Sequence, residues 1–118
     1  MKYEFDSNLP IYLQVMEIIK NEIFDHHYNP GDKIASVREM ALAYGVNPNT
    51  IQKALNELER TGIIYSKRAV GRYVGEDIEL IERMKKEVIN EKIAAFLNEM
   101  QEMGYDKNMI IKMIEEFE

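Results

Sequence analysis

Polar side chains recur along one short stretch of this sequence at the spacing of a helix face. They are Asn49, Lys53, Asn56 and Arg60, with Thr50 and Gln52 at the flanks. An α-helix would place the first four on a single side, because each lies three or four positions after the one before. Amides and hydroxyls hydrogen-bond the edges of DNA bases, and cations bind phosphate groups. The pattern therefore predicts a helix surface that contacts double-stranded DNA.

The other side of the same stretch is apolar, with Ile51, Ala54, Leu55 and Leu58 at helical spacing. Asn47 is a suitable cap for the helix, and Pro48 suits the first helical position because its missing N–H is not needed there. Thr61-Gly62 is predicted to end it.

A second short helix is predicted directly before this one. Ser36 and Glu39 have the spacing of a capping box, in which each side chain bonds the backbone N–H of the other residue. Gly45 supplies a left-handed stop. Two short helices joined by such a tight turn are typical of a helix-turn-helix.

A two-stranded wing is predicted to follow, from residues 63–65 and 73–74. Lys67, Arg68 and Arg72 lie around its tip and are interpreted as DNA contacts, because they stand next to the predicted recognition helix. Residues 33–34 are expected to add a short third strand.

A helix over residues 10–26 is expected to pack across the back of the two short helices, through Ile11, Val15, Ile18, Ile19 and Ile23. Residues 1–9 are interpreted as a loose lead-in. The predicted fold class is mostly α with a small β-wing, and the first domain is a winged helix-turn-helix over residues 1–75.

Residues 76–118 form the second predicted domain, a helical hairpin. A long helix is expected from Asp77 to about Met103, and Asp106 is expected to cap a last one. This hairpin is too small to bury its apolar side chains alone, and a symmetric dimer would cover them. The predicted dimer interface comprises Ile81, Met84, Val88, Ile93, Phe96, Met100, Ile110, Met113, Ile114 and Phe117.

The charge of the chain is unevenly distributed. The net charge is −6, yet residues 33–75 carry seven basic side chains against three acidic ones, and residues 77–118 carry six against eleven. Phosphate binding depends on the local charge and not on the total, so a DNA-binding segment is compatible with an acidic chain.

Composition excludes several other classes of protein. The 118 residues include no cysteine, which excludes disulfides and thiolate metal sites. We find no apolar run long enough to cross a bilayer and no signal-peptide pattern, so a soluble cytoplasmic protein is expected. His26-His27 is interpreted as a favourable pair at a helix C-terminus and not as a metal site. The motifs of enzymes and cofactor sites are missing, so no catalytic residue, metal or cofactor is expected.

Several motifs together resemble the GntR family of bacterial transcription regulators, and more narrowly its YtrA subfamily. They are PIYLQV from Pro10, YNPGDKI from Tyr28, SVREMA from Ser36, GVNPNTIQKALNELERTGII from Gly45, and GRYV from Gly71. The resemblance implies a homodimer that binds a palindromic operator, in most cases as a repressor. It implies no large effector domain, and the residues specify no small-molecule effector.

The resemblance also assigns DNA contacts to particular positions of this chain. These are Arg38 on the second helix, Asn47, Asn49, Thr50 and Gln52 on the recognition helix, and Arg68 with Ala69 on the wing. Bidentate amide contacts favour adenine, so a half-site containing A·T pairs is expected.

Three positions depart from the family pattern. Ala35 replaces a common proline, Ala69-Val70 replace glycines at the wing tip, and Arg72 replaces a small hydroxyl residue. A residue with a β-carbon is strained at positive φ, so a wing turn of different shape is expected.

Two alternatives to DNA binding remain at this point. A winged-helix module that binds another protein would fit the net acidity. RNA binding fits less well, because the deep, narrow major groove of A-form RNA does not admit this helix.

Overall fold

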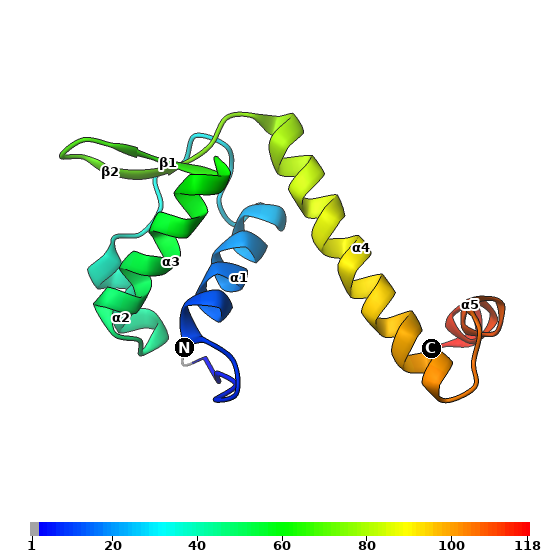
Figure 1. Ribbon diagram of the computed structural model, residues 1–118. Coiled ribbons are helices and arrows are strands. Elements are labelled where there is room, and N and C mark those ends of the chain that lie inside the picture. Colours follow the sequence, from blue (N-terminus) through cyan, green and yellow to red (C-terminus); the bar gives the residue numbers. More distant parts are fainter. Residues whose placement is uncertain (1–2) are drawn as a thin grey trace. The chain divides into compact units, whose positions relative to one another are not determined.

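The computed structural model describes residues 3–118 and shows a mostly helical chain with a small β-wing (Figure 1), which confirms the predicted fold class. The elements are α1 (Ile11–Phe24), α2 (Val37–Tyr44), α3 (Pro48–Thr61), β1 (Ile64–Lys67), β2 (Gly71–Val74), α4 (Ile78–Glu102) and α5 (Lys107–Glu116).

The chain divides into two compact units, residues 1–82 and 83–118. Residues 1 and 2, which belong to the first predicted domain, lie outside the described residues. The first turn of α4 lies in the first unit, and Ile81 on this turn is buried, with 7% of its surface exposed. The domain boundary expected after residue 75 stays a prediction.

The short helices α2 and α3 begin and end where the local signals place them. Ser36 and Glu39 form the full capping box, and Gly45 ends α2 in the left-handed conformation with φ of 68°. Asn47 caps α3 by accepting a hydrogen bond from the backbone N–H of Asn49 over 2.8 Å. Eight residues are too few for a stable isolated helix, so α2 depends on packing against α3.

The core of the first unit lies between α1, α2 and α3. Helices α1 and α3 run side by side (Figure 1), and α2 packs against α3. The side chains that are almost fully buried include Val15, Ile19, Met40, Ile51, Ala54, Leu55, Leu58, Ile63, Ile64 and Val74. The apolar side of α3 is therefore buried within the first unit, and its polar side faces outward.

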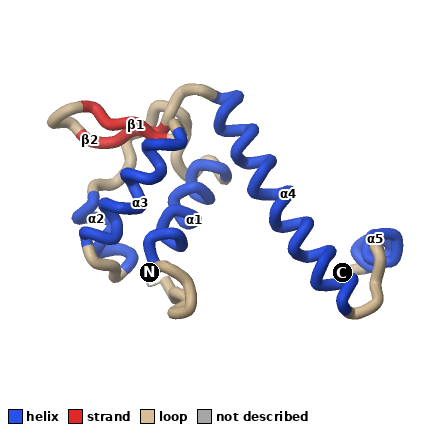
Figure 2. Tube along the Cα trace, in the orientation of Figure 1, coloured by secondary structure: helices blue, strands red, loops and turns tan. Residues whose placement is uncertain are grey.

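The wing is a two-stranded antiparallel sheet (Figure 2), in which Ile64 pairs with Val74 and Lys67 with Gly71. Both strands extend nearer to the tip than expected. The predicted third strand is reduced to a single bridge between Lys33 and Tyr73. Two backbone hydrogen bonds make this bridge: the Ile34 N–H donates to the Arg72 carbonyl over 3.0 Å, and the Val74 N–H donates to the Asp32 carbonyl over 2.8 Å.

The segment before α1 is held against the helices rather than loose. The side chain of Gln14 on α1 accepts from the backbone N–H of Asp6 and donates to its carbonyl, each over 2.8 Å. The rings of Tyr3 and Tyr44 meet edge to face with centroids 4.9 Å apart. The expectation of a loose lead-in was wrong for these residues, because two contacts distant in sequence hold them.

The second unit contains most of α4 and all of α5, and Asp106 caps α5 as predicted. Within it only Ile110 among the large apolar side chains is buried, with 5% exposed. Exposed ones include Ile89, Ile93, Phe96, Met103, Met109, Ile111, Met113, Ile114 and Phe117. In the described part of the chain, none of the helices has the length and apolarity needed to span a membrane.

Candidate nucleic-acid interface

The polar side of α3 is exposed along the whole helix. Asn49, Gln52, Lys53 and Asn56 are exposed, while the apolar side chains on the opposite side of α3 are fully buried. The structure therefore brings together on one open surface the amides and the lysine that the spacing placed on one side.

The start of α3 offers further donors. Asn47 is exposed, and its carbonyl oxygen is occupied by the backbone N–H of Asn49, which leaves its amide N–H groups for other partners. Thr50 is half-buried. Arg38 is exposed on α2. The first turn of a helix carries free N–H groups and a positive end of the dipole, which favours phosphate.

Lys53 has an aromatic neighbour within the first unit. Its Nζ atom lies 4.0 Å from the centre of the Tyr12 ring on α1. A cation over a ring at an exposed site contributes about 0.5–1 kcal/mol. This contact orders the lysine side chain while its ammonium group stays at the surface.

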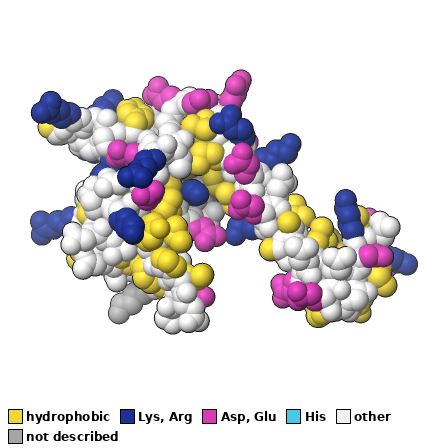
Figure 3. All heavy atoms as spheres, in the orientation of Figure 1, with side chains coloured by type: hydrophobic (Ala, Val, Ile, Leu, Met, Phe, Trp, Pro, Cys, Tyr) yellow, Lys and Arg dark blue, Asp and Glu magenta, His cyan; other side chains and the backbone are white. Residues whose placement is uncertain are grey.

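The wing presents two exposed cations. Arg68 is exposed in the turn and Lys67 on the end of β1, and basic side chains gather at the wing tip in Figure 3. The Nζ atom of Lys67 lies 4.4 Å from the centre of the Tyr73 ring, which itself stacks on Tyr65. Ala69 adopts φ of 62° in the turn, so the wing does contain a residue with a β-carbon in the left-handed region.

Arg72 differs from the other cations because its guanidinium is bound to α3. Its Nε atom donates to Oε1 of Glu59 over 2.5 Å, and its Nη2 atom donates to Oδ1 of Asn56 over 3.1 Å. The side chain is largely covered. The predicted DNA contact of Arg72 stays a prediction, and the structure assigns the residue a role within the protein.

Glu59 is the anion that holds the wing on α3. It also accepts a hydrogen bond from the Ser66 hydroxyl on β1. Desolvation by burial acts to raise the pKa of Glu59, but the hydrogen bonds from Ser66 and Arg72 and the charge of Arg72 outweigh it, so the pKa is lowered. Glu59 is therefore ionised at neutral pH and joins both strands to the recognition helix.

The sequence interpretation missed Glu59 and this network. Glu59 lies 13 positions before Arg72, and only the register of the hairpin brings the two together. A signal was present, since Arg72 and Ser66 are register partners across the two strands and both therefore project from the same side of the wing.

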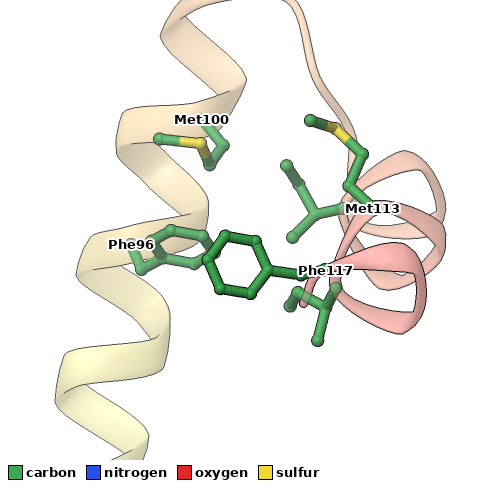
Figure 4. A pocket seen from close by; sticks show the side chains of 6 residues that line it. Phe96, Met100, Met113 and Phe117 are labelled. Atoms are coloured by element: carbon green, nitrogen blue, oxygen red, sulfur yellow. The ribbon is translucent and has the colours of Figure 1, made fainter.

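A second exposed surface lies in the unit 83–118. Phe96, Met100, Met113 and Phe117 line an apolar hollow of about 360 Å³ together with Ile110 and Ile114 (Figure 4). Of the residues predicted for the dimer interface, Ile93, Phe96, Met113, Ile114 and Phe117 are exposed; Met84, Val88 and Met100 are half-buried. Ile81 and Ile110 are already buried within a single chain, so their surface is not free for a partner.

The sequence profile of the bacterial regulatory proteins of the gntR family matches residues 11–74, which span α1 to the end of the wing. The chain belongs to the GntR family. This GntR protein is 38% identical over 117 residues to the uncharacterized HTH-type transcriptional regulator YhcF of Bacillus subtilis, covering 99% of this chain and 97% of YhcF. It is 36% identical over 112 residues to the HTH-type transcriptional repressor YtrA of the same organism, covering 93% and 85%.

Solved structures agree with this membership. A GntR family transcriptional regulator from Listeria monocytogenes superposes with a TM-score of 0.90 at 41% identity, covering 97% of this chain and all of the other. The DNA-binding domain of AraR in complex with operator ORE1 superposes with a TM-score of 0.56 at 34% identity, covering 61% of this chain and 90% of that domain. The GntR protein is therefore a transcriptional regulator with a DNA-binding domain, and not an enzyme.

Proposed function

We propose that this GntR protein is a repressor that binds a palindromic operator in double-stranded DNA as a homodimer. The observation that carries the proposal is the exposed polar side of α3, which bears Asn49, Gln52, Lys53 and Asn56 beside the exposed cations of the wing. The structurally similar DNA-binding domain of AraR was crystallised in complex with operator DNA, and the relative YtrA is named a repressor.

In the proposed complex α3 enters the major groove and the wing contacts the flanking backbone. Arg38, Lys53, Lys67 and Arg68 neutralise phosphates, while Asn47, Asn49, Thr50 and Gln52 contact bases and their sugars. Amide pairs to adenine favour half-sites with A·T pairs.

If the protein dimerises through the unit 83–118, its operator is expected to have two-fold symmetry. Two copies related by a two-fold axis place their α3 helices on half-sites about one helical turn apart, or a multiple of it. A dimer lying across a promoter in this way excludes RNA polymerase, which makes repression steric. Both the homodimer and the repression belong to the proposal.

The test is selection of binding sites from a library of DNA duplexes with a random central segment. We expect an enriched motif with two-fold symmetry, and a footprint of the same symmetry. Each neutralised phosphate should contribute about −0.9 to the log–log slope of affinity against salt. A motif without a dyad, or binding that is indifferent to salt, would contradict the proposal.

Charge-matched variants separate DNA binding from a protein-interaction function. The pair Gln52→Glu and Lys53→Glu should lower affinity for the selected duplex about 100-fold or more, because it replaces a base contact and a phosphate contact by anions. The control pair, Gln101→Glu and Lys86→Glu, makes the same charge change on exposed positions of α4. Equal losses in both pairs would mean that total charge, and not this surface of α3, determines binding.

A further inference from the structure

A chain of hydrogen bonds connects the wing to the exposed side of α3. Arg72 on β2 donates to Glu59 over 2.5 Å and to the Oδ1 atom of Asn56 over 3.1 Å. The Nε2 atom of Gln52, one turn earlier on α3, donates to the same Oδ1 atom over 3.1 Å. Ser66 on β1 donates to Glu59 and so ties the other strand to the same carboxylate. The chain thus runs from both strands to a predicted base contact.

The guanidinium of Arg72 determines the orientation of the side-chain amides of Asn56 and Gln52. Arginine has N–H donors and no acceptor, so the atom of Asn56 that meets Arg72 must be the carbonyl oxygen. Because this oxygen also faces Gln52, the atom of Gln52 that meets it must be the amide nitrogen. Without Arg72 both amides could turn over together and still bond to each other. Arg72 therefore removes an ambiguity that an amide pair has by itself.

Arginine is suited to this role because its donors are separate atoms in a rigid plane. Nε serves Glu59 and Nη2 serves Asn56, so the ion pair that anchors the wing also fixes the angle from which the amide is met. Glu59 is ionised at neutral pH, which keeps the guanidinium in this position.

We propose that Arg72 is a positioning residue that sets the hydrogen-bonding polarity of the recognition surface, and that Asn56 and Gln52 determine base specificity in that polarity. The inference rests on the proposed function, since it assumes that α3 enters the major groove. Asn56 keeps its N–H donors outside the network and Gln52 keeps its carbonyl oxygen outside it. Both side chains are exposed on α3.

This polarity has a consequence for the operator. Guanine presents N7 and O6 as acceptors in the major groove, whereas cytosine presents an N4 amino donor. Asn56 offers donors only, so it favours a base edge that presents an acceptor and disfavours an amino group. Gln52 offers an oxygen with its remaining N–H, which matches the N6 and N7 atoms of adenine.

The test repeats the selection from random duplexes with two variants that each remove one wing cation. Arg72→Met removes the donors of the network, and Arg68→Met removes an exposed cation at the wing tip. With Arg72→Met we expect the preference at the base pairs opposite Asn56 and Gln52 to fall about fivefold or more, because a good base contact provides that much discrimination. With Arg68→Met we expect weaker binding to all sequences alike and an unchanged motif.

Asn56→Asp tests the same idea without disturbing the wing. An aspartate still presents an oxygen to Arg72 and Gln52, but it replaces the N–H donors of Asn56 by a second acceptor. The selected base at this position should change from one that presents an acceptor to one that presents an amino group, as in contacts of Asp to the cytosine N4. Selection of the wild-type motif by both Asn56→Asp and Arg72→Met would overturn the proposal.

A measurement without DNA separates this inference from the proposed function. In NMR spectra of the free chain, Arg72→Met should shift the side-chain amide signals of Asn56 and Gln52 and speed their exchange with solvent. Arg68→Met should leave them unchanged. Amide signals indifferent to Arg72→Met would overturn the positioning role. A wild-type chain that selects no sequence would instead overturn the proposed function, even with the amide signals responding as expected.

Discussion

At the scale of single residues, the wing turn contains one of the two residues other than glycine that adopt a positive φ in the described chain; the other is His26, with φ of 67°. Ala69 has φ of 62°, and the N–H of Val70 bonds the carbonyl of Lys67 over 3.0 Å. Arg68, the second residue of this turn, does not have a positive φ. A positive φ at the third residue alone is typical of a type II turn, which normally takes glycine there. Alanine in the left-handed region costs about 1–2 kcal/mol.

Ala69→Gly is therefore expected to stabilise the protein. The substitution removes the strain but increases the backbone entropy lost on folding, which for glycine is about 0.5–1 kcal/mol. The balance should raise the free energy of unfolding by roughly 0.5–1 kcal/mol, measured by urea denaturation. Val70→Gly is the control, because Val70 has no positive φ. Greater stability in the control than in Ala69→Gly would place the strain elsewhere in the turn.

At the scale of secondary structure elements, the sequence predicted α2 and α3 almost residue by residue. Their ends depend on local chemistry: the Ser36–Glu39 capping box, the left-handed Gly45, and the Asn47 cap before Pro48. The wing was less predictable. Its strand ends depend on the register of pairing between β1 and β2, which no local signal in either strand determines. Helix α1 also differs from the prediction, because it ends at Phe24 and not at residue 26.

The candidate DNA surface was predictable on α3 but not where the wing contacts it. Helical spacing alone placed Asn49, Lys53 and Asn56 on one side of α3, and the structure has all three exposed. The partner of Arg72 could not be predicted in this way, because an exposed arginine and an arginine bound to Glu59 look alike in a sequence. Register and twist of the hairpin decide between them.

The attachment of the wing to α3 should depend on pH through Glu59. Its pKa is lowered from the ordinary value of 4.5 in the folded chain. A lowered pKa means that the ionised carboxylate stabilises the fold above pH 4.5, and that this contribution disappears as the pH falls through the folded-state pKa.

Glu59→Gln is the variant that tests this dependence. A glutamine remains neutral, so the difference in stability between wild type and Glu59→Gln should be largest near pH 7 and shrink as the pH falls below 4.5. Urea denaturation at several pH values measures this difference. Glu57→Gln is the control, because Glu57 has only a long ion pair of 3.7 Å to exposed Arg60. A difference for Glu59→Gln that grows on acidification would contradict the assigned direction of the pKa.

At the scale of the whole molecule, the two units differ in how far they bury their large apolar side chains. The first buries an apolar core between its three helices, although single large side chains such as Leu13 and Leu42 stay exposed, whereas residues 83–118 bury only Ile110 among their large apolar side chains. A unit of 36 residues has too little volume to cover such side chains alone. The alignments to YhcF and YtrA cover 99% and 93% of this chain, so both include most of the second unit.

Ile114→Asp is expected to separate the proposed dimer. Ile114 is 59% exposed and lines the hollow together with Phe96 and Phe117. A two-fold axis would bring the aspartate into the interface twice, and an unpaired buried polar group costs about 1–3 kcal/mol. The dimer dissociation constant should therefore rise at least about 30-fold, as measured by sedimentation equilibrium. Leu42→Asp is the control, because Leu42 is even more exposed, at 78%, but lies on α2 in the first unit.

Ile114→Asp and its control Leu42→Asp also test whether DNA binding depends on the dimer. If the operator is read by a dimer, Ile114→Asp should bind a single half-site as wild type does but lose the gain that wild type shows on the full palindrome. That gain comes from the second half-site being contacted within one complex, at a high effective concentration. Two outcomes would contradict a dimer formed through the exposed apolar surface of residues 83–118. One is a wild-type chain that sediments as a monomer, and the other is equal affinity of wild type and Ile114→Asp for the palindrome.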